Sequence, residues 1–246
     1  MISDILTIIW KEIRELILQR SGLRGGGIGL LIVLVVFGVL IPLQSGPDWL
    51  TSSTTILLWA WVPFILVNSV VADSFAGERE RHTLETLLAS RLSDRAILIG
   101  KICSAIAYGW GITLFGILVA LVVINVAFNS GNLLFFPLPN GLAIFIFSFL
   151  VAWLAAGLGV LVSLRASSVR QAQQTLSLAF LVFLIPLLLL PLLPQNMQIN
   201  VSNALQAFDF QSAALIAGAA LLVIDLVLLG MANLRFKRAR LILDQS

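Results

Sequence analysis

Six long apolar stretches restrict what this chain can fold into more than any other feature. They cover about residues 28–43, 53–72, 97–127, 141–164, 175–193 and 212–232. A helix needs about 20 mostly apolar residues to cross a hydrocarbon core roughly 30 Å thick. Lipid offers the backbone no hydrogen-bond partners, so only helices and closed barrels cross it, and these stretches are far too long for barrel strands. The sequence therefore predicts an all-α integral membrane protein with six transmembrane helices.

Composition agrees with this prediction and leaves no room for a separate soluble domain. Of the 246 residues, 59% are hydrophobic and 11% are charged, whereas soluble domains carry about 25% charged residues. The mean hydropathy is +1.04. Because the connections between the apolar stretches are short, residues 1–246 are expected to form a single transmembrane domain.

Basic residues predict the orientation of the chain in the membrane. The 15 lysines and arginines fall into four groups, which six spans would place on the same side. The groups lie within residues 11–24, 79–101, 165–170 and 235–240. The other three connections contain no lysine or arginine. Since basic residues concentrate in cytoplasmic loops, we expect a multi-pass protein of the cell (inner or plasma) membrane with both termini in the cytoplasm.

Residues 2–20 precede the first span and have the pattern of an amphipathic helix. Apolar side chains recur there at helical spacing, namely Ile2, Ile5, Ile9, Ile13, Leu16 and Ile17. Charged residues such as Lys11 and Glu15 fall largely on the opposite face. This pattern is typical of a helix that lies in the membrane interface, with Trp10 at the level of the headgroups. The alternative is a soluble tail helix, which would need a partner for its apolar stripe.

The sixth stretch carries two features of its own. It has a face of small residues suited to close helix packing, namely Ala213, Ala214, Ala217, Gly218, Ala219 and Ala220. It also contains Asp225, the one ionisable residue well inside a span, and a carboxylate in lipid is by default a functional candidate. In the structural alternative, Asp225 is neutral or hydrogen-bonded to Asn68 or another polar side chain.

No catalytic residue, metal site or bound cofactor is predicted for this chain. His82 and Cys103 are its single histidine and single cysteine, too few to hold a metal. The Gly100-Lys101 pair is followed by Ile102 and lacks the upstream glycine of a phosphate-binding loop, so this chain is not expected to hold a nucleotide itself. The bases lie at the ends of apolar stretches rather than along a stripe, which argues against nucleic acid as a partner.

Charge is concentrated between the second and third spans. Ten of the 15 basic and 12 acidic residues lie between Asp73 and Lys101. The alternating charges of residues 78–81 predict that the second span continues as a helix into water, and Ser93 is expected to cap the third span. Thr83 is expected to cap a short helix with Glu85 near its positive end. The leucines of this helix form one apolar face: Leu84, Leu87 and Leu88. The residues alone leave two interpretations open: a docking surface for a partner protein, or a solvated loop whose leucines dip into the membrane.

This charged segment resembles the loop between the second and third spans of ABC-2 type permeases, the membrane subunits of one class of ATP-binding cassette exporters. That family shows an acidic residue at the span end, then Glu-x-Glu-x-x-Thr-x-Glu-x-Leu-Leu, often Pro, then a basic residue and Gly-Lys. The matching residues are Asp73, Glu78, Glu80, Thr83, Glu85, Leu87, Leu88, Arg95, Gly100 and Lys101. Arg91 stands where Pro is usual.

The resemblance implies a function and a set of partners. Residues 76–96 would form a coupling loop that docks on a cytoplasmic ATPase subunit, present in two copies and carrying ATP and Mg²⁺. The permease would work as a dimer with a second copy or a homologous permease. The residues implied in ATPase coupling are Glu78, Glu80, Thr83, Leu84, Glu85, Leu87 and Leu88.

We therefore expect the permease subunit of an ATP-driven exporter, which is not itself an enzyme. Two alternatives come from other classes of protein. One is an ion-coupled secondary transporter that uses Asp225, which would usually show an internal repeat, and this sequence shows no convincing one. The other is a non-transporting membrane scaffold that recruits a cytoplasmic partner.

Overall fold

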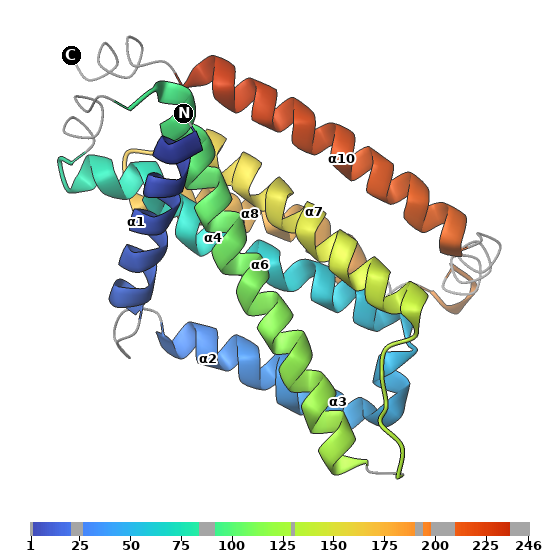
Figure 1. The fold of residues 1–246 in the computed structure, drawn as a ribbon. Helices are drawn as coiled ribbons and strands as arrows, with labels where there is room; N and C mark the ends of the chain where they lie inside the picture. The colour runs from blue at the N-terminus through green and yellow to red at the C-terminus, as the bar shows by residue number, and fades with distance from the viewer. Residues whose placement is uncertain are drawn as a thin grey trace.

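The chain folds into a bundle of long helices arranged around α4 (Figure 1). The structure, a computed structural model, describes residues 2–20, 27–83, 92–128, 131–189, 194–197 and 210–236. Every regular element in these ranges is helical. The elements are α1 (Ile2–Arg20), α2 (Ile28–Val35), η2 (Val36–Leu40), α3 (Ile41–Ser45), η3 (Gly46–Leu50), α4 (Ser53–Glu80), α6 (Asp94–Ala127), α7 (Leu138–Ser163), α8 (Val169–Leu189) and α10 (Phe210–Arg235).

Five of the described segments are long and apolar enough to cross a membrane, which confirms an all-helical membrane protein. They are Ile28–Leu50, Ser53–Glu80, Asp94–Ala127, Leu138–Ser163 and Ala213–Arg235. α8 matches the predicted span at 175–193 but is not among the five. Polar side chains occur in its first turns, namely Arg170, Gln171, Gln173 and Gln174, and the rest of the helix is largely apolar. The sixth crossing stays a prediction.

The first span extends further than its predicted end at residue 43. It runs as α2, the π-helical η2, α3 and the 3-10 turn η3, which ends at Leu50. Pro42 near the start of α3 has no N–H to donate, and the wide turns of η2 come directly before it. The η3 turn then brings Trp49 into the core, where it is buried beside Ile124 of α6.

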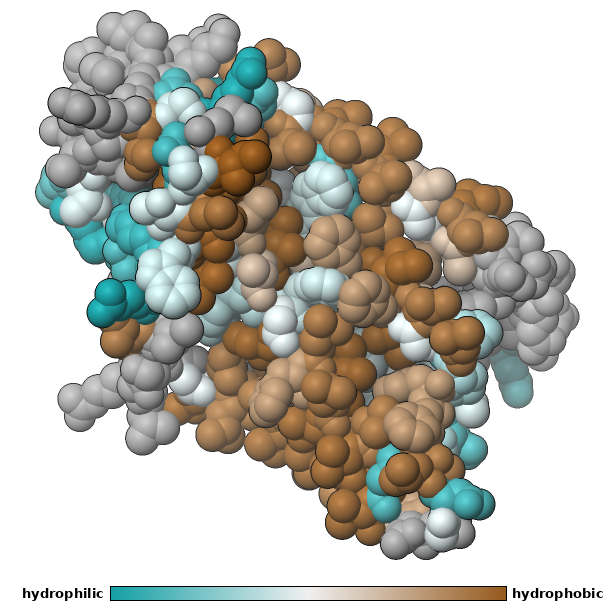
Figure 2. Space-filling view, in the orientation of Figure 1, coloured by the Kyte–Doolittle hydropathy of each residue, from teal (hydrophilic) through white to brown (hydrophobic). Residues whose placement is uncertain are grey.

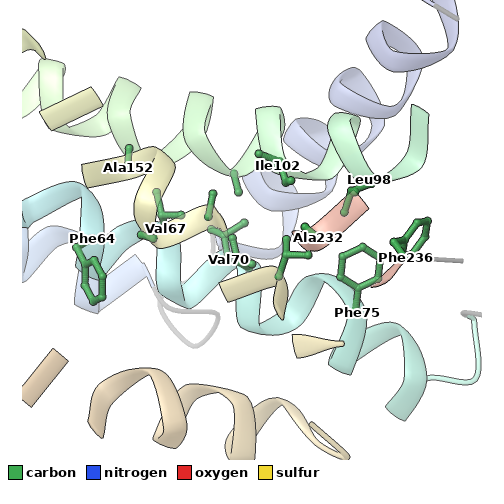
Figure 3. Close-up of a cluster of buried hydrophobic side chains, with 14 of the residues drawn as sticks. Phe64, Val67, Val70, Phe75, Leu98, Ile102, Ala152, Ala232 and Phe236 are labelled. Atoms are coloured by element: carbon green, nitrogen blue, oxygen red, sulfur yellow. The ribbon is translucent and has the colours of Figure 1, made fainter. Parts of the chain in front are cut away.

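α4 is the most buried of the candidate spans. Within its apolar segment, 67% of the residues are buried inside the subunit. Glycines on the neighbouring helices allow this approach: a Cβ added to Gly159 of α7 would lie 2.6 Å from the side chain of Val71. Gly109 of α6 faces Val67 in the same way. Figure 3 shows the resulting core, in which side chains of α4 meet those of α6, α7 and the end of α10.

α1 is helical as predicted, and it docks against α6. Its buried side includes Ile8, and a Cβ added to Gly100 of α6 would lie 2.7 Å from that side chain. Part of its apolar surface therefore has a partner within the chain. The other part is exposed, with Ile2 at 74% and Trp10 at 72%.

α10 lies at the edge of the bundle, drawn in red in Figure 1. Only 6% of its apolar segment is buried. Within this subunit, the first half of α10 does not pack closely against α7, because Gly218 and Ala219 line an apolar groove of 740 Å³ between the two helices. α10 packs more closely against α7 in its second half, where Leu228 contacts Gly157 of α7. Figure 2 shows a largely apolar face, with hydrophilic residues mainly along the left side beside α1 and a smaller group at the lower right.

Candidate functional site at the charged end of α4

The described part of the charged connection starts where α4 ends. The helix closes in a Schellman motif: the N–H of Thr83 donates to the carbonyl of Glu78 at 2.9 Å, and the N–H of His82 donates to that of Arg79 at 3.1 Å. His82 has φ 55°, a left-handed conformation that histidine adopts more readily than most non-glycine residues. The predicted helical continuation of the second span through Glu80 is confirmed, and this motif fixes the direction in which the chain leaves the helix.

The two predicted helix caps have different outcomes. Ser93 caps α6 as predicted, because its hydroxyl accepts a hydrogen bond from the N–H of Ala96 at 3.2 Å. Thr83 instead donates its hydroxyl to the carbonyl of Glu78 at 3.3 Å, at the end of α4. The short helix that Thr83 was expected to cap falls in residues 84–91, outside the described residues.

A buried lysine joins three helices beside this end. Nζ of Lys101 in α6 donates to Glu12 Oε1 of α1 and to Glu78 Oε1 of α4, both at 2.9 Å. It also donates to the carbonyl of Ser74 at 3.0 Å, so all three N–H groups of the ammonium are used. We call Lys101, Glu12 and Glu78 the Lys101 cluster. Their side chains are only 2%, 14% and 10% exposed.

Burial makes the Lys101 cluster sensitive to the loss of any member. Removing one partner from a buried ion pair costs about 3–5 kcal/mol, because an uncompensated charge stays behind. The ring of Phe75 lies 5.3 Å from Nζ of Lys101 and adds a cation–π contact. The second carboxylate oxygen of Glu78 is buried and has no hydrogen-bond partner among the described residues. In this conformation Glu78 is therefore engaged within the subunit rather than available to another protein.

The opposite side of the α4 end holds the turn between α7 and α8. Arg79 donates to the carbonyls of Leu164 and Ala166 at 3.0 Å and 2.6 Å. Carbonyls at the end of a helix lack intrahelical partners, so the guanidinium satisfies groups that would otherwise need water. Glu80 accepts a hydrogen bond from the N–H of Val169 at 3.1 Å. This places a carboxylate at the positive end of α8, where the helix dipole favours it.

Close packing strengthens the same contact between α4 and the α7–α8 turn. The hydroxyl of Ser163 donates to the carbonyl of Ala72 at 3.1 Å and accepts from the N–H of Ala76 at 3.0 Å. It thus bridges two groups that bond each other directly in a regular α-helix. A buried cluster surrounds it, formed by Ala72, Ala76, Ala166, Ala172 and Leu176. The alanines of this cluster allow α4 and α8 to approach closely.

A more exposed ion pair runs along the last turns of α4. Arg81 donates through two nitrogens to the two carboxylate oxygens of Asp73 at 3.2 Å and 3.3 Å. Gly77 lies between them, and a side chain there would collide with the Asp73 carboxylate. Because water screens both charges, such a pair contributes about 0–1 kcal/mol.

The charged end of α4 is connected to helices on both of its sides. In the part of the chain that the structure describes, no group of His, Cys, Asp or Glu side chains is arranged to hold a metal ion. The Lys101 cluster ties the last turns of α4 to α1 and α6, while Arg79 and Glu80 tie them to the α7–α8 turn. A displacement of this end of α4 would therefore act on four other helices.

The predicted coupling residues divide into two sets. Glu78, Glu80 and Thr83 lie in the described residues, and all three make contacts inside the subunit. The remaining residues lie outside the described residues: Leu84, Glu85, Leu87 and Leu88. A contact between any of the seven and an ATPase stays a prediction.

Sequence reasoning missed several residues of this site. Glu12 had a usable signal, because a lysine near the start of an apolar helix needs a counter-charge and the preceding segment offers few carboxylates. Arg79 and Ser163 had no such signal. Their partners are backbone groups of a turn and of a helix interior, which no side-chain pattern identifies.

Asp225 lies apart from the charged end of α4. It is 0% exposed, and neither of its carboxylate oxygens has a hydrogen-bond partner among the described residues. The alternative with a hydrogen bond to Asn68 is therefore not observed among the described residues, while the neutral and the functional alternatives for Asp225 stay predictions. Asn68 lines a pocket between α4 and α8, whereas Asp225 lies one turn before Leu228, which contacts Gly157 of α7.

Comparison with known proteins places the chain in a family. Residues 3–186 match the family described as ABC-2 type transporter. The ABC transporter permease protein NatB of Bacillus subtilis (strain 168) is 27% identical over 156 residues, which cover 58% of this chain and 40% of that protein. The chain thus spans two fifths of the length of this curated relative. The chain belongs to the ABC-2 type transporter family, as a multi-pass membrane permease.

Proposed function

We propose that this permease serves an ATP-driven exporter and that residues 76–96 couple it to a separate cytoplasmic ATPase. The Lys101 cluster is the observation that supports this most strongly. It ties α1, α4 and α6 together at the two places where the charged connection leaves and re-enters the bundle. A displacement of the end of α4 would reach these helices through the buried ion pairs. ATP and Mg²⁺ would be bound by the ATPase, in two copies per complex.

The proposed topology has six crossings, with α8 as the fifth. The basic residues support it, because their four groups then share one side, which would be the cytoplasmic one. Both termini would lie in the cytoplasm. The exposed Ile2 and Trp10 of α1 fit a helix that lies in the membrane interface while its other side docks on α6.

The coupling residues would have two different roles. Leu84, Leu87 and Leu88 would form the apolar surface that enters a groove on the ATPase, with Glu85 beside them. Glu78 and Glu80 would be positioning residues, because their carboxylates already bind Lys101 and the start of α8. Docking and transmission would thus be carried by neighbouring but separate side chains.

A polar face on α4 and α8 suits the export pathway. A pocket of 390 Å³ lies there, lined by Asn68, Gln173 and Ser177 and by the stacked rings of Phe64 and Phe180. Amide and hydroxyl groups facing lipid are costly. This face would instead turn toward a second permease, either another copy or a homologous chain, and the two would enclose the pathway.

Asp225 favours a second candidate, an ion-coupled transporter. A carboxylate buried inside a span without a partner among the described residues has the surroundings expected of an ion or proton site. Transport in proteoliposomes driven by a proton gradient without ATP would support this candidate. Binding of a cytoplasmic partner without any ATP-dependent transport would instead support the alternative of a non-transporting membrane scaffold.

The coupling assignment is tested with two single substitutions in the complex purified from its own membranes. Leu87→Asp would put a charge on the docking surface and is expected to lower the amount of bound ATPase at least tenfold. Met197→Asp is the control, because Met197 is an exposed apolar residue in a connection assigned to the opposite side. Both chains should elute as folded protein. Unchanged ATPase binding by Leu87→Asp would contradict the proposal.

A further inference from the structure

We propose that segment 131–138, which links α6 to the first residue of α7, is embedded in the lipid leaflet opposite the charged end of α4. Leu133, Phe135 and Leu138 would lie among the lipids of the interfacial region. The partner of this surface is therefore the membrane itself. This proposal concerns the opposite end of the bundle and does not depend on the ATPase.

Alternate residues of the segment have opposite surroundings. Leu134 and Phe136 pack against the core that contains Trp49. Leu133 and Phe135 are 74% and 63% exposed, and Leu138 at the start of α7 is 75% exposed. The protein thus presents a row of large apolar side chains on a connection between helices, where polar residues are the usual choice for contact with water.

The segment is held in this conformation by Asn125 near the end of α6. The amide of Asn125 donates to the carbonyl of Leu134 at 2.8 Å, and its oxygen accepts from the N–H of Leu134 at 2.7 Å. Both backbone groups of one residue are therefore satisfied by one side chain. Asn140 then ties the start of α7 to the carbonyl of Thr51 at 2.9 Å. With these contacts in place, Leu133 and Phe135 stay on the outer side.

Charge separates this connection from the one at the opposite end. No charged residue occurs from Ile102 to Leu164, a stretch that includes the whole connection between α6 and α7. In contrast, ten charged residues lie between Asp73 and Lys101, around the connection between α4 and α6. Exposed apolar patches mark surfaces that contact a membrane or another protein, and a connection without any charge is compatible with burial in a leaflet.

Helix lengths put the segment at the depth of the headgroups. Lys101 and Ser163 mark one level, because both contact the last turns of α4. From that level to Val126 on α6, and likewise to Leu138 on α7, the distance is about 38 Å at a rise of about 1.5 Å per residue. A bilayer is about 30 Å thick in its hydrocarbon core and about 40–45 Å with headgroups. With the charged end at one edge of the hydrocarbon and the average helix tilt of about 20°, the depth is about 36 Å, which puts segment 131–138 in the far interfacial region.

The flanking helices favour lipid over a second subunit as the occupant. α6 carries an exposed apolar row at helical spacing that leads directly to the segment: Phe115, Leu118, Val122 and Val126. Leu142 and Ile146 continue it on α7 and border the apolar groove beside α10. This surface has no charged group to complement. The polar face that suits a partner permease lies elsewhere, on α4 and α8.

Fluorescence quenching in vesicles tests the proposal. The chain has one cysteine, so Cys103→Ala provides a background for single labelled sites. Phe135→Cys carries an environment-sensitive fluorophore in vesicles of phosphatidylcholine and phosphatidylglycerol. Asp48→Cys, exposed in the η3 turn, is the water-facing control, and Val126→Cys is the lipid-facing control. Leu133→Cys repeats the measurement at a second position of the segment.

We expect the fluorophore at Phe135 to behave like the one at Val126. Iodide in the water should quench it at least threefold less than at Asp48, and phosphatidylcholine with a spin label near the headgroup should quench it strongly. Iodide quenching equal to that at Asp48 would overturn the proposal. Protection from both quenchers would also overturn it, because the segment would then be covered by protein.

Discussion

α4 and α10 are apolar helices of similar length, 28 and 26 residues, in opposite surroundings. In α4, 67% of the apolar segment is buried, compared with 6% in α10. Glycines of α6 and α7 allow α4 to pack closely at the centre of the bundle. Charged side chains at the end of α4 form ion pairs and hydrogen bonds with neighbouring helices. α10 has its own small residues, yet Gly218 and Ala219 line an open groove. The contrast shows that hydropathy brings both helices into the membrane, while specific contacts decide which one lies at the centre.

The largest expected effect comes from Lys101→Met, which breaks the charged contact of α4 with α1 and α6. Glu12 and Glu78 would be left buried without their cation, so the free energy of unfolding should fall by about 3–5 kcal/mol. Unfolding in mixed detergent, followed by tryptophan fluorescence, measures this change.

A triple neutral variant is the control for Lys101→Met. Glu12→Gln and Glu78→Gln added to Lys101→Met remove the stranded carboxylates and should recover more than half of the loss. A triple variant less stable than Lys101→Met would show that the ion pairing is not the cause.

Substitution of one arginine at the end of α4 and one at the end of α10 tests whether the two helix ends contribute differently to stability. Arg79→Met removes the charged donor to two carbonyls of the α7–α8 turn, and a loss of about 2–3 kcal/mol is expected for such bonds. Arg235→Met, at the end of α10, should change the free energy of unfolding by about 0.5 kcal/mol or less, as at surface sites. Equal losses would remove the distinction between the two helix ends.

Substitution of one glycine packed against α4 and one glycine on α10 tests how tightly the two helices are packed. Gly159→Ala would drive a methyl group into Val71 of α4, and overpacking of this kind costs about 1–3 kcal/mol. Gly230→Ala on α10 meets nothing within 4 Å and should be neutral or stabilise the helix by up to about 1 kcal/mol. The same unfolding measurement applies, and a Gly159→Ala chain as stable as Gly230→Ala would argue against a tightly packed α4.

The smallest expected effect concerns the end of α4. His82→Gly relieves a left-handed conformation and should raise the free energy of unfolding by about 0.5 kcal/mol. His82→Ala keeps the Cβ and should give no gain. A gain in both variants would trace the effect to the imidazole rather than to the backbone.

Much of the fold follows from the sequence because single residues mark the helix ends. Ser93 caps α6 at its predicted place, and the charges after Gly77 extend α4 beyond its apolar stretch. The start of α8 was harder to predict from the sequence. Its first turns are polar, and their place in a helix is explained only by their contact with α4 and with the turn before α8. The open edge position of α10 was not predictable, because its small residues looked equally suited to close packing.

The candidate site was predictable in position but not in its contacts. The density of charge identified residues 73–101, and the Glu and Gly-Lys residues identified the family. The pairing of Lys101 with Glu12 joins residues 89 positions apart. The sequence indicates that Lys101 needs a counter-charge, but it does not show which carboxylate supplies it. Glu78 and Glu80 were predicted as coupling residues, and their contacts with Lys101 and the start of α8 were not foreseen.

Transmission through the charged end of α4 is tested most directly in the intact complex with the ATPase. A fluorophore on Gln173→Cys, in the Cys103→Ala background, reports on the exposed polar face of α8, and ATP should change its emission. Glu78→Ala, with the ATPase still bound, is expected to reduce this ATP-dependent change at least fivefold. Glu15→Ala, an exposed neighbour on α1, should leave it intact. A full ATP response in Glu78→Ala would contradict transmission through the Lys101 cluster.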